Sequence, residues 1–145
     1  MLMQWSKDLA VGHPIVDYDH KMLINIANEF HFAVENGAGE EAVAMALERL
    51  IQYVESHFRR EEELFMDSAY PNKAAHQKNH RDIEKMVREF QAAYAADPAS
   101  IDLKKLLNFF KVWLIKHIGK LDKAYVPYVK AAEHKQGNRR REGFV

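Results

Sequence analysis

The chain has 145 residues, of which 48% are hydrophobic and 29% charged, so it is long enough to bury one core and form a single domain. Its 21 basic and 21 acidic side chains balance, and no segment approaches the run of about 20 apolar residues that spans a bilayer, so we expect neither nucleic-acid binding nor a transmembrane segment. The chain has no cysteine, which excludes disulfides, thiolate metal sites and iron-sulfur clusters and agrees with a cytoplasmic location.

The first predicted element is an extended arm over residues 1–16, which show no sustained periodicity and contain a glycine and a proline. A helix is then predicted over about residues 18–36, with Asp17 as its N-cap and His20 on its apolar stripe. An Asn-Gly pair is expected to end this helix.

Three further long helices are predicted from apolar residues that recur at steps of three and four, over about residues 40–67, 71–96 and 101–118. Pro71 is expected in the first turn of the third helix, where proline is tolerated. Gly119 is expected to interrupt the fourth. A short helix of about residues 120–133 and a mobile basic tail of residues 134–145 should follow.

Four long amphipathic helices with short connections predict an all-α fold, an antiparallel up-down-up-down four-helix bundle over about residues 17–120, within one domain of residues 1–145. In this topology the starts of the first and third helices share an end with the finishes of the second and fourth. Six polar residues on the apolar stripes then converge on that end: His20, His57, Glu61, His76, His80 and His117. A buried imidazole or carboxylate without a partner is costly, so we expect a ligand that binds them together.

Metal is the expected ligand, and Asp122 joins the six residues as a seventh candidate. The second and third helices each offer a pair of candidates four residues apart, so each pair presents two ligands from one helix face. Five imidazoles and two carboxylates without thiolate suit two ions of iron, manganese or zinc, with Glu61 and Asp122 between the ions. His117 and Asp122 would point about 140° apart on a continuous α-helix, so a break at Gly119 is expected to bring Asp122 back.

The remaining polar residues receive an ordinary structural interpretation. His13, His31 and His134 are expected to take no part in the metal site. A solvated surface is expected for the charged residues beside the candidate ligands and for the C-terminal arginines: Arg59, Arg60, Glu62, Glu63 and residues 139–141.

The candidate ligands stand in motifs that resemble the hemerythrins, and best their single-domain bacterial branch, the bacteriohemerythrins. The resemblance covers about residues 5–128. It rests on Trp5 and Gly12, Ile15–Lys21, His57-Phe58 with Glu61-Glu62, Tyr70-Pro71 with His76 and His80, and Trp113 with His117-Ile118 and Asp122. The resemblance implies a non-haem di-iron centre (Fe2+/Fe3+) that binds O2 reversibly.

The resemblance also implies a role for each candidate residue. The ligands of one iron would be His76, His80 and His117, and those of the other His20 and His57. The bridges would be Glu61, Asp122 and an oxo or hydroxo group. The iron with two histidines would keep an open position, where O2 would bind as hydroperoxide. An apolar pocket that excludes water would be lined by Leu23, Ile24, Trp113, Leu114 and Ile118.

Two other functions stay open beside this one. A di-iron oxidase or peroxidase would use the same metal, although the chain lacks the Glu-x-x-His motifs of ferritin-like oxidases. O2 sensing would need a separate signalling partner, because no residues remain for an output module. We therefore expect a non-catalytic monomer that carries, stores or delivers O2, with an oxygen-consuming enzyme as the recipient.

Overall fold

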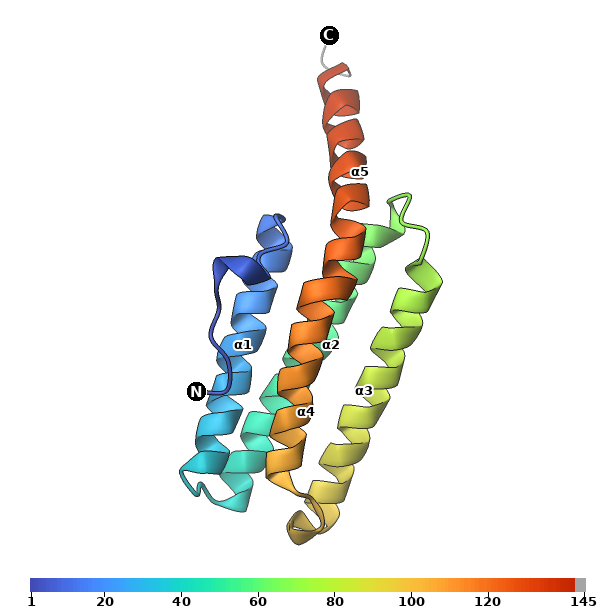
Figure 1. Ribbon diagram of the computed structural model, residues 1–145. Helices are drawn as coiled ribbons and strands as arrows, with labels where there is room; N and C mark the ends of the chain where they lie inside the picture. Colours follow the sequence, from blue (N-terminus) through green and yellow to red (C-terminus); the bar gives the residue numbers. More distant parts are fainter. Residues whose placement is uncertain (143–145) are drawn as a thin grey trace.

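The computed structural model describes residues 1–142. Within that range the chain forms five α-helices and no strand: α1 (Pro14–Glu35), α2 (Glu40–Met66), α3 (Lys73–Ala96), α4 (Leu103–Lys116) and α5 (Asp122–Glu142) (Figure 1). Two single turns of 3-10 helix, η1 (Lys7–Leu9) and η2 (Pro98–Ser100), lie in the connections. A π-helical segment, η3 (His117–Leu121), joins α4 to α5.

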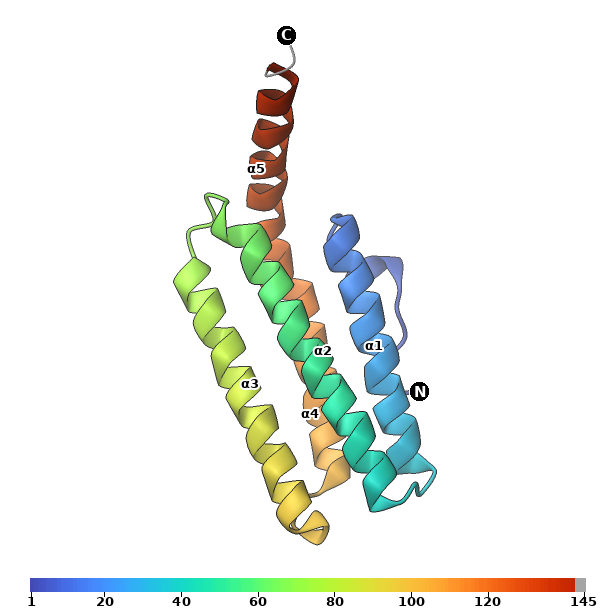
Figure 2. The same ribbon diagram turned by 180° about the vertical axis from the view of Figure 1, so that it is seen from behind.

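The helices α1 to α4 run alternately down and up, as the two opposite views show (Figures 1 and 2). α1 packs against α2 and α4, and α2 packs against α3. α5 continues the direction of α4 and rises past the end of the bundle where α1 and α3 begin. The predicted antiparallel up-down-up-down four-helix bundle is therefore confirmed. No helix among the described residues is both long and apolar enough to cross a membrane.

The start of α1 differs from the sequence prediction. The helix begins at Pro14 rather than at 18, because proline fits the first helical position, where its missing N–H is not needed. The arm therefore ends at His13, which is the N-cap. Asp17 is not the N-cap; its carboxylate accepts hydrogen bonds from the backbone N–H groups of Val11 (2.7 Å) and Gly12 (3.3 Å) and so fixes the arm from inside the helix.

The other helix ends agree with the prediction to within a few residues, except at the C-terminus. α3 begins at Lys73, so Pro71 lies in the preceding turn and not in the helix. α4 begins after Asp102, whose carboxylate accepts from the N–H groups of Lys104 and Lys105. α5 runs to Glu142 and so extends beyond the predicted end at residue 133 into the predicted tail.

The apolar core is divided into two parts by a layer of polar side chains. The larger part fills the body of the bundle and includes Leu47, Phe30 and Phe110. The smaller part lies toward α5 and consists of Val16, Phe65, Tyr70, Tyr125, Val126 and Val129. The polar side chains that lie between these two parts are therefore shielded from water on both sides.

Candidate metal centre

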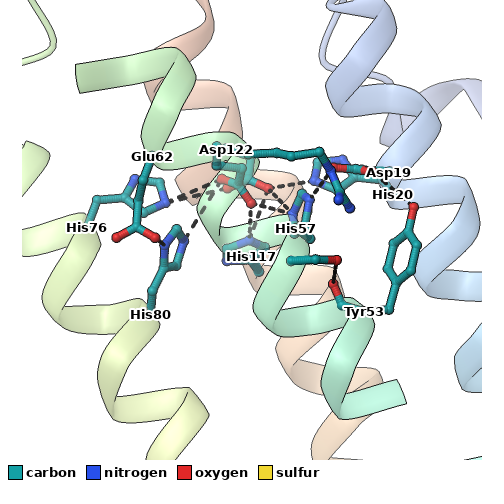
Figure 3. A network of polar contacts seen from close by, with 12 residues as sticks. Asp19, His20, Tyr53, His57, Glu62, His76, His80, His117 and Asp122 are labelled. Carbon is teal, nitrogen blue, oxygen red and sulfur yellow. Dashed lines mark hydrogen bonds and ion pairs between the residues drawn. The ribbon is translucent and has the colours of Figure 1, made fainter. Parts of the chain in front are cut away.

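The seven predicted ligands lie together in this polar layer (Figure 3). They are His20 from α1, His57 and Glu61 from α2, His76 and His80 from α3, His117 from η3 and Asp122 from α5. We call them the ligand cluster. None is more than 3% exposed, and five are completely buried. The sequence prediction that these residues meet at one end of the bundle is confirmed.

The five histidines of the cluster all direct Nε2 toward the two carboxylates. His20 Nε2 lies 2.5 Å from Asp122 Oδ2. His117 Nε2 lies 3.0 Å from Glu61 Oε1 and 3.1 Å from Asp122 Oδ2, while His76 Nε2 is 3.7 and 3.6 Å from oxygens of the same two carboxylates. The same ring nitrogen of every histidine therefore faces the middle of the cluster.

Each carboxylate divides its two oxygens between two sides of the cluster. Glu61 Oε1 faces His117, whereas Oε2 faces His76 at 3.7 Å and His80 at 4.0 Å. Asp122 Oδ2 likewise faces His117, while Oδ1 faces His76 at 3.6 Å. Because a carboxylate bridges two metal ions by giving one oxygen to each, this orientation suits a dinuclear centre.

The potential ligand atoms form two overlapping sets, and within each set all atoms lie within 4.8 Å of one another. The first set comprises His20, His57, Glu61, His117 and Asp122, and the second comprises His76, His80 and His117. The family resemblance assigns His117 to the second set alone, whereas here it belongs to both. It lies at the contact between the two sides of the cluster.

The expected helix break at Gly119 does not occur. Instead the chain passes through η3, in which the N–H of Asp122 bonds to the carbonyl oxygen of His117, five residues earlier. The π-helical turn contains one residue more than an α-turn, so residues five apart lie on nearly the same face. His117 and Asp122 thus reach the cluster together on a continuous helical rod, and the α-helical spacing from which a break was predicted does not apply here.

The cluster contains buried polar atoms that lack hydrogen-bond partners among the described residues. They include Nε2 of His57, His76 and His80, Oε2 of Glu61 and Oδ1 of Asp122. Orphaned groups of this kind are costly in a core unless something binds them. Because all of them are imidazole nitrogens or carboxylate oxygens and face one another, the residues present fit a pair of metal ions with nitrogen and oxygen ligands.

Electrostatics lead to the same conclusion. Burial lowers the pKa of His117, but Asp122 and Glu61 outweigh it and raise the pKa to about 9. Burial raises the pKa of Asp122, but His117 and other histidines bring it well below its ordinary value. Burial, together with the neighbouring His117 and His76, lowers the pKa of His80 to about 2. The two carboxylates thus stabilise positive charge at the centre of the cluster, and metal cations would supply that charge.

Two residues that the sequence analysis placed only within family motifs, without a role of their own, support the cluster from outside. Asp19 bonds to Nδ1 of His57 (3.0 Å), and the Tyr70 hydroxyl lies 3.2 Å from Nδ1 of His76. Such outer contacts orient imidazole ligands. Asp19 lies three residues after Val16 and four before Leu23, on the buried face of α1, and this spacing is the sequence signal that could have singled it out.

Tyr125 is completely buried beside the cluster, and burial together with the charges of Glu61 and Asp122 raises the pKa of its phenol.

The predicted solvated surface beside the ligands is wrong at Glu62, whose side chain is only 13% exposed and is paired with Arg81. Arg60 is also not free in solvent, because its Nε donates to Asp19 at 2.7 Å.

The five residues of the predicted apolar pocket are all buried in the larger part of the core: Leu23, Ile24, Trp113, Leu114 and Ile118. Trp113 stacks on the imidazole of His117, with ring centroids 5.0 Å apart. Phe58, which was not among the predicted pocket residues, stacks on His80 with centroids 3.9 Å apart. Apolar side chains therefore cover the cluster on the side of the bundle interior.

The other histidines lie outside both ligand sets among the described residues. His13 is buried, and its Nε2 lies 2.9 Å from Glu133 of α5. His31 is half-buried and lies 3.8 Å from Glu35 of its own helix. The expectation that these histidines belong to the general structure and not to the metal site agrees with their positions.

Comparison with known proteins supplies independent information. The model of the hemerythrin HHE cation binding domain matches residues 11–129. A bacteriohemerythrin of Stenotrophomonas maltophilia (strain R551-3) is 33% identical over 143 residues, covering 94% of this chain and 91% of the relative. A bacteriohemerythrin of Pseudomonas aeruginosa (strain LESB58) is 34% identical over 127 residues, covering 87% and 80%.

Comparison of structures agrees with the comparison of sequences. A crystal structure of wild-type hemerythrin superposes with a TM-score of 0.82 at 28% identity, covering 89% of this chain and 98% of the other. The match includes the segments that carry all seven cluster residues, since the family model extends from residue 11 to residue 129. The chain belongs to the hemerythrin family.

Proposed function

We propose that this protein binds O2 reversibly at a non-haem di-iron centre held by the ligand cluster. The proposal rests on one observation above all: five Nε2 atoms point at two buried carboxylates, each of which offers one oxygen to either side. Membership of the hemerythrin family and similarity to bacteriohemerythrins support the same function.

If His117 is assigned to the iron beside His76 and His80, as the family resemblance implies, the two sides of the cluster differ in the number of histidines. In our assignment His76, His80 and His117 hold one iron, and His20 and His57 hold the other, with Glu61 and Asp122 between them. When bound, the iron pair would supply the electrons that make O2 binding possible. The side with two histidines has fewer protein ligands, so we place O2 on that side.

The apolar residues around the cluster have the task of excluding water. Leu23 and Ile24 follow His20 on α1, and both are at most 1% exposed. Leu114 and Ile118, equally buried, flank His117. A dry surrounding would keep water and protons away from the centre and so favour release of O2 over irreversible oxidation. These residues therefore support reversible binding rather than turnover.

A test of the proposal begins with metal analysis. The protein reconstituted with Fe2+ should contain two irons per chain, gain a visible absorption on exposure to O2 and lose it under vacuum. Glu61→Ala or His80→Ala should reduce the iron content below two, whereas His31→Ala, a histidine outside the cluster, should leave it unchanged. Unchanged stoichiometry in Glu61→Ala or His80→Ala would contradict the assignment of that ligand.

The same experiment distinguishes the binding protein from a di-iron oxidase or peroxidase. An O2 carrier should release O2 on evacuation over repeated cycles. Repeated consumption of O2 or peroxide with an added reductant would favour an enzyme instead. The proposal also includes a cytoplasmic monomer that delivers O2 to an oxygen-consuming enzyme, and light scattering of the purified protein tests the monomer directly.

A further inference from the structure

Asp19 forms an anionic contact with one side of the ligand cluster. Asp19 immediately precedes His20 on α1. Its side chain reaches across to α2, where Oδ2 accepts from Nδ1 of His57 at 3.0 Å (Figure 3). The same oxygen accepts from Nε of Arg60 at 2.7 Å, and Oδ1 accepts from the Tyr53 hydroxyl at 2.9 Å. Asp19 is 4% exposed, so these three donors take the place of water.

No other histidine of the cluster has a carboxylate hydrogen-bonded to Nδ1 among the described residues. Nδ1 of His76 faces the neutral hydroxyl of Tyr70. Nδ1 of His80 lies 3.5 Å from Glu62 without a hydrogen bond. Nδ1 of His20 and Nδ1 of His117 have no hydrogen-bond partner among these residues. Among the described residues, a carboxylate hydrogen bond to Nδ1 is therefore confined to His57 within the cluster.

We propose that Asp19 is a positioning residue that makes the His20 and His57 side of the cluster electronically different from the other side. By accepting the Nδ1 proton, Asp19 fixes the tautomer of His57 in which the Nε2 lone pair faces the centre. Its negative charge also makes that imidazole a stronger donor. This side should therefore bind metal more tightly and favour the oxidised state. The inference rests on the proposed function, since it concerns the side on which we place O2.

Arg60 and Tyr53 act on the same carboxylate from outside. Their hydrogen bonds hold Asp19 in place, and the guanidinium of Arg60 neutralises part of its charge. The Arg60 guanidinium also lies 5.2 Å from the centre of the Tyr53 ring, which keeps the two donors together. Removal of the Arg60 charge should therefore increase the donor strength of His57, the opposite of removing the charge of Asp19.

The chain offers a matched control on the other side of the cluster. Glu62 stands beside the ligand Glu61 as Asp19 stands beside His20, and it is paired with Arg81 as Asp19 is paired with Arg60. Its 3.5 Å approach to His80 is too long for a hydrogen bond. Asp19→Asn and Glu62→Gln therefore remove the same charge at similar positions, but only the first removes it from a hydrogen-bonded imidazole.

The first measurement is the affinity of the metal-free protein for Zn2+, determined by competition with a chelator. Asp19→Asn should weaken one of two zinc sites about 10- to 100-fold, the usual effect of losing an outer partner of a ligand. Glu62→Gln should change either site less than about threefold. Equal effects of the two variants, or no effect of Asp19→Asn, would overturn the proposal.

The second measurement is the midpoint potential of the iron-loaded protein. Asp19→Asn should raise the potential, and Arg60→Gln should lower it. Arg59→Gln removes the same charge from an exposed neighbour on α2, so it should have little effect. A shift of the same sign in Asp19→Asn and Arg60→Gln would show that these residues act only on packing, and would overturn the proposal.

The third measurement separates the failure of this inference from the failure of the proposed function. In 15N NMR spectra of the zinc-loaded protein, the Nδ1–H of His57 should be protected from solvent exchange, and replacement of Asp19 by Ala should remove the protection. If Asp19→Ala does not fold, two other measurements decide the question: the exchange protection of the His57 Nδ1–H in the wild type, and the zinc affinity of Arg60→Gln. Both can succeed even if the iron-loaded protein fails to bind O2 reversibly.

Discussion

Nε2 of His20 in α1 lies 2.5 Å from Oδ2 of Asp122, the first residue of α5, so the first and last helices of the chain meet at the ligand cluster. Both residues are completely buried. Three other helices, α2, α3 and α4, separate α1 from α5 along the chain. The ligand cluster therefore links parts of the chain that are far apart in sequence, and its metal should contribute to stability as well as to function.

Asp122→Ala should reduce the iron content below two per chain, because it removes a carboxylate that faces both sides of the cluster. It should also release His20 from its contact with α5. Metal analysis after reconstitution with Fe2+ measures the first effect. Asp67→Ala, which changes an exposed residue next to the end of α2, should still bind two irons. Two irons in Asp122→Ala would contradict the bridging role.

Metal removal should lower the thermal midpoint of unfolding. Without metal, the buried imidazole and carboxylate atoms of the cluster that lack hydrogen bonds have no partner. A metal present at about 100 times its dissociation constant stabilises a protein by about 2.7 kcal/mol. For a chain of this size the expected difference is about 10 °C. Calorimetry with and without chelator measures it. His80→Ala should show a smaller difference, and equal midpoints for loaded and metal-free wild type would count against a metal that bridges the helices.

Ile24→Thr should accelerate the irreversible oxidation of the iron-loaded protein in air. The substitution places a hydroxyl on α1 beside His20, at a position that is 1% exposed, and should admit water to the cluster. Absorption spectra followed over time give the rate. Val87→Thr makes a comparable change in α3, also at 1% exposure, but beyond the ligand pair of that helix. If both variants oxidise at the same rate, Ile24 does not belong to the O2 pocket.

Glu48→Gln should reduce stability at neutral pH and lose this effect in acid. The hydrogen bond from Gln91 is the main cause that lowers the pKa of Glu48, and Arg88 contributes to the same shift. Because the pKa is lowered by folding, the stabilisation is fully present above the ordinary pKa of about 4.5 and disappears as the pH falls through the lower folded value.

Since the side chain of Glu48 is 38% exposed, the expected loss in Glu48→Gln at pH 7 is only about 0.5 kcal/mol. Urea denaturation of the metal-free protein at pH 7 and in acid measures it without interference from metal loss. The exposed Glu89→Gln on α3 provides the control. A difference between wild type and Glu48→Gln that grows in acid would contradict the sign of the shift.

The helices and the meeting of six cluster residues, from His20 to His117, could be predicted from the sequence because both depend on periodicity, whereas Asp122 lies on no predicted stripe. A histidine on an apolar stripe must face the core, and the antiparallel topology decides at which end it lies. The start of α1 was harder, since Asp17 and Pro14 both signal a helix start and the proline prevailed. The role of Asp19 could not be found in this way, because its place on the buried face of α1 does not indicate which helix its carboxylate contacts.

The connection between α4 and α5 was predicted incorrectly for a different reason. The expected break at Gly119 followed from α-helical geometry, in which His117 and Asp122 diverge. A π-helical turn has no clear sequence signature and changes that geometry without ending the helix. The sequence thus indicated which residues lie together, but not the backbone geometry that brings the last of them into place.

The extra residue in η3 has a consequence for how this segment tolerates a change in length. Deleting one residue between His117 and Asp122 would leave them four apart, the spacing at which an ordinary α-helix presents two side chains on one face. Asp122 would then still face the cluster, and Tyr125 and Val129 would stay in the smaller part of the core. At the present length, by contrast, a regular α-helix would direct His117 and Asp122 about 140° apart, so the site depends on the match between the number of residues in this segment and its π-helical turn.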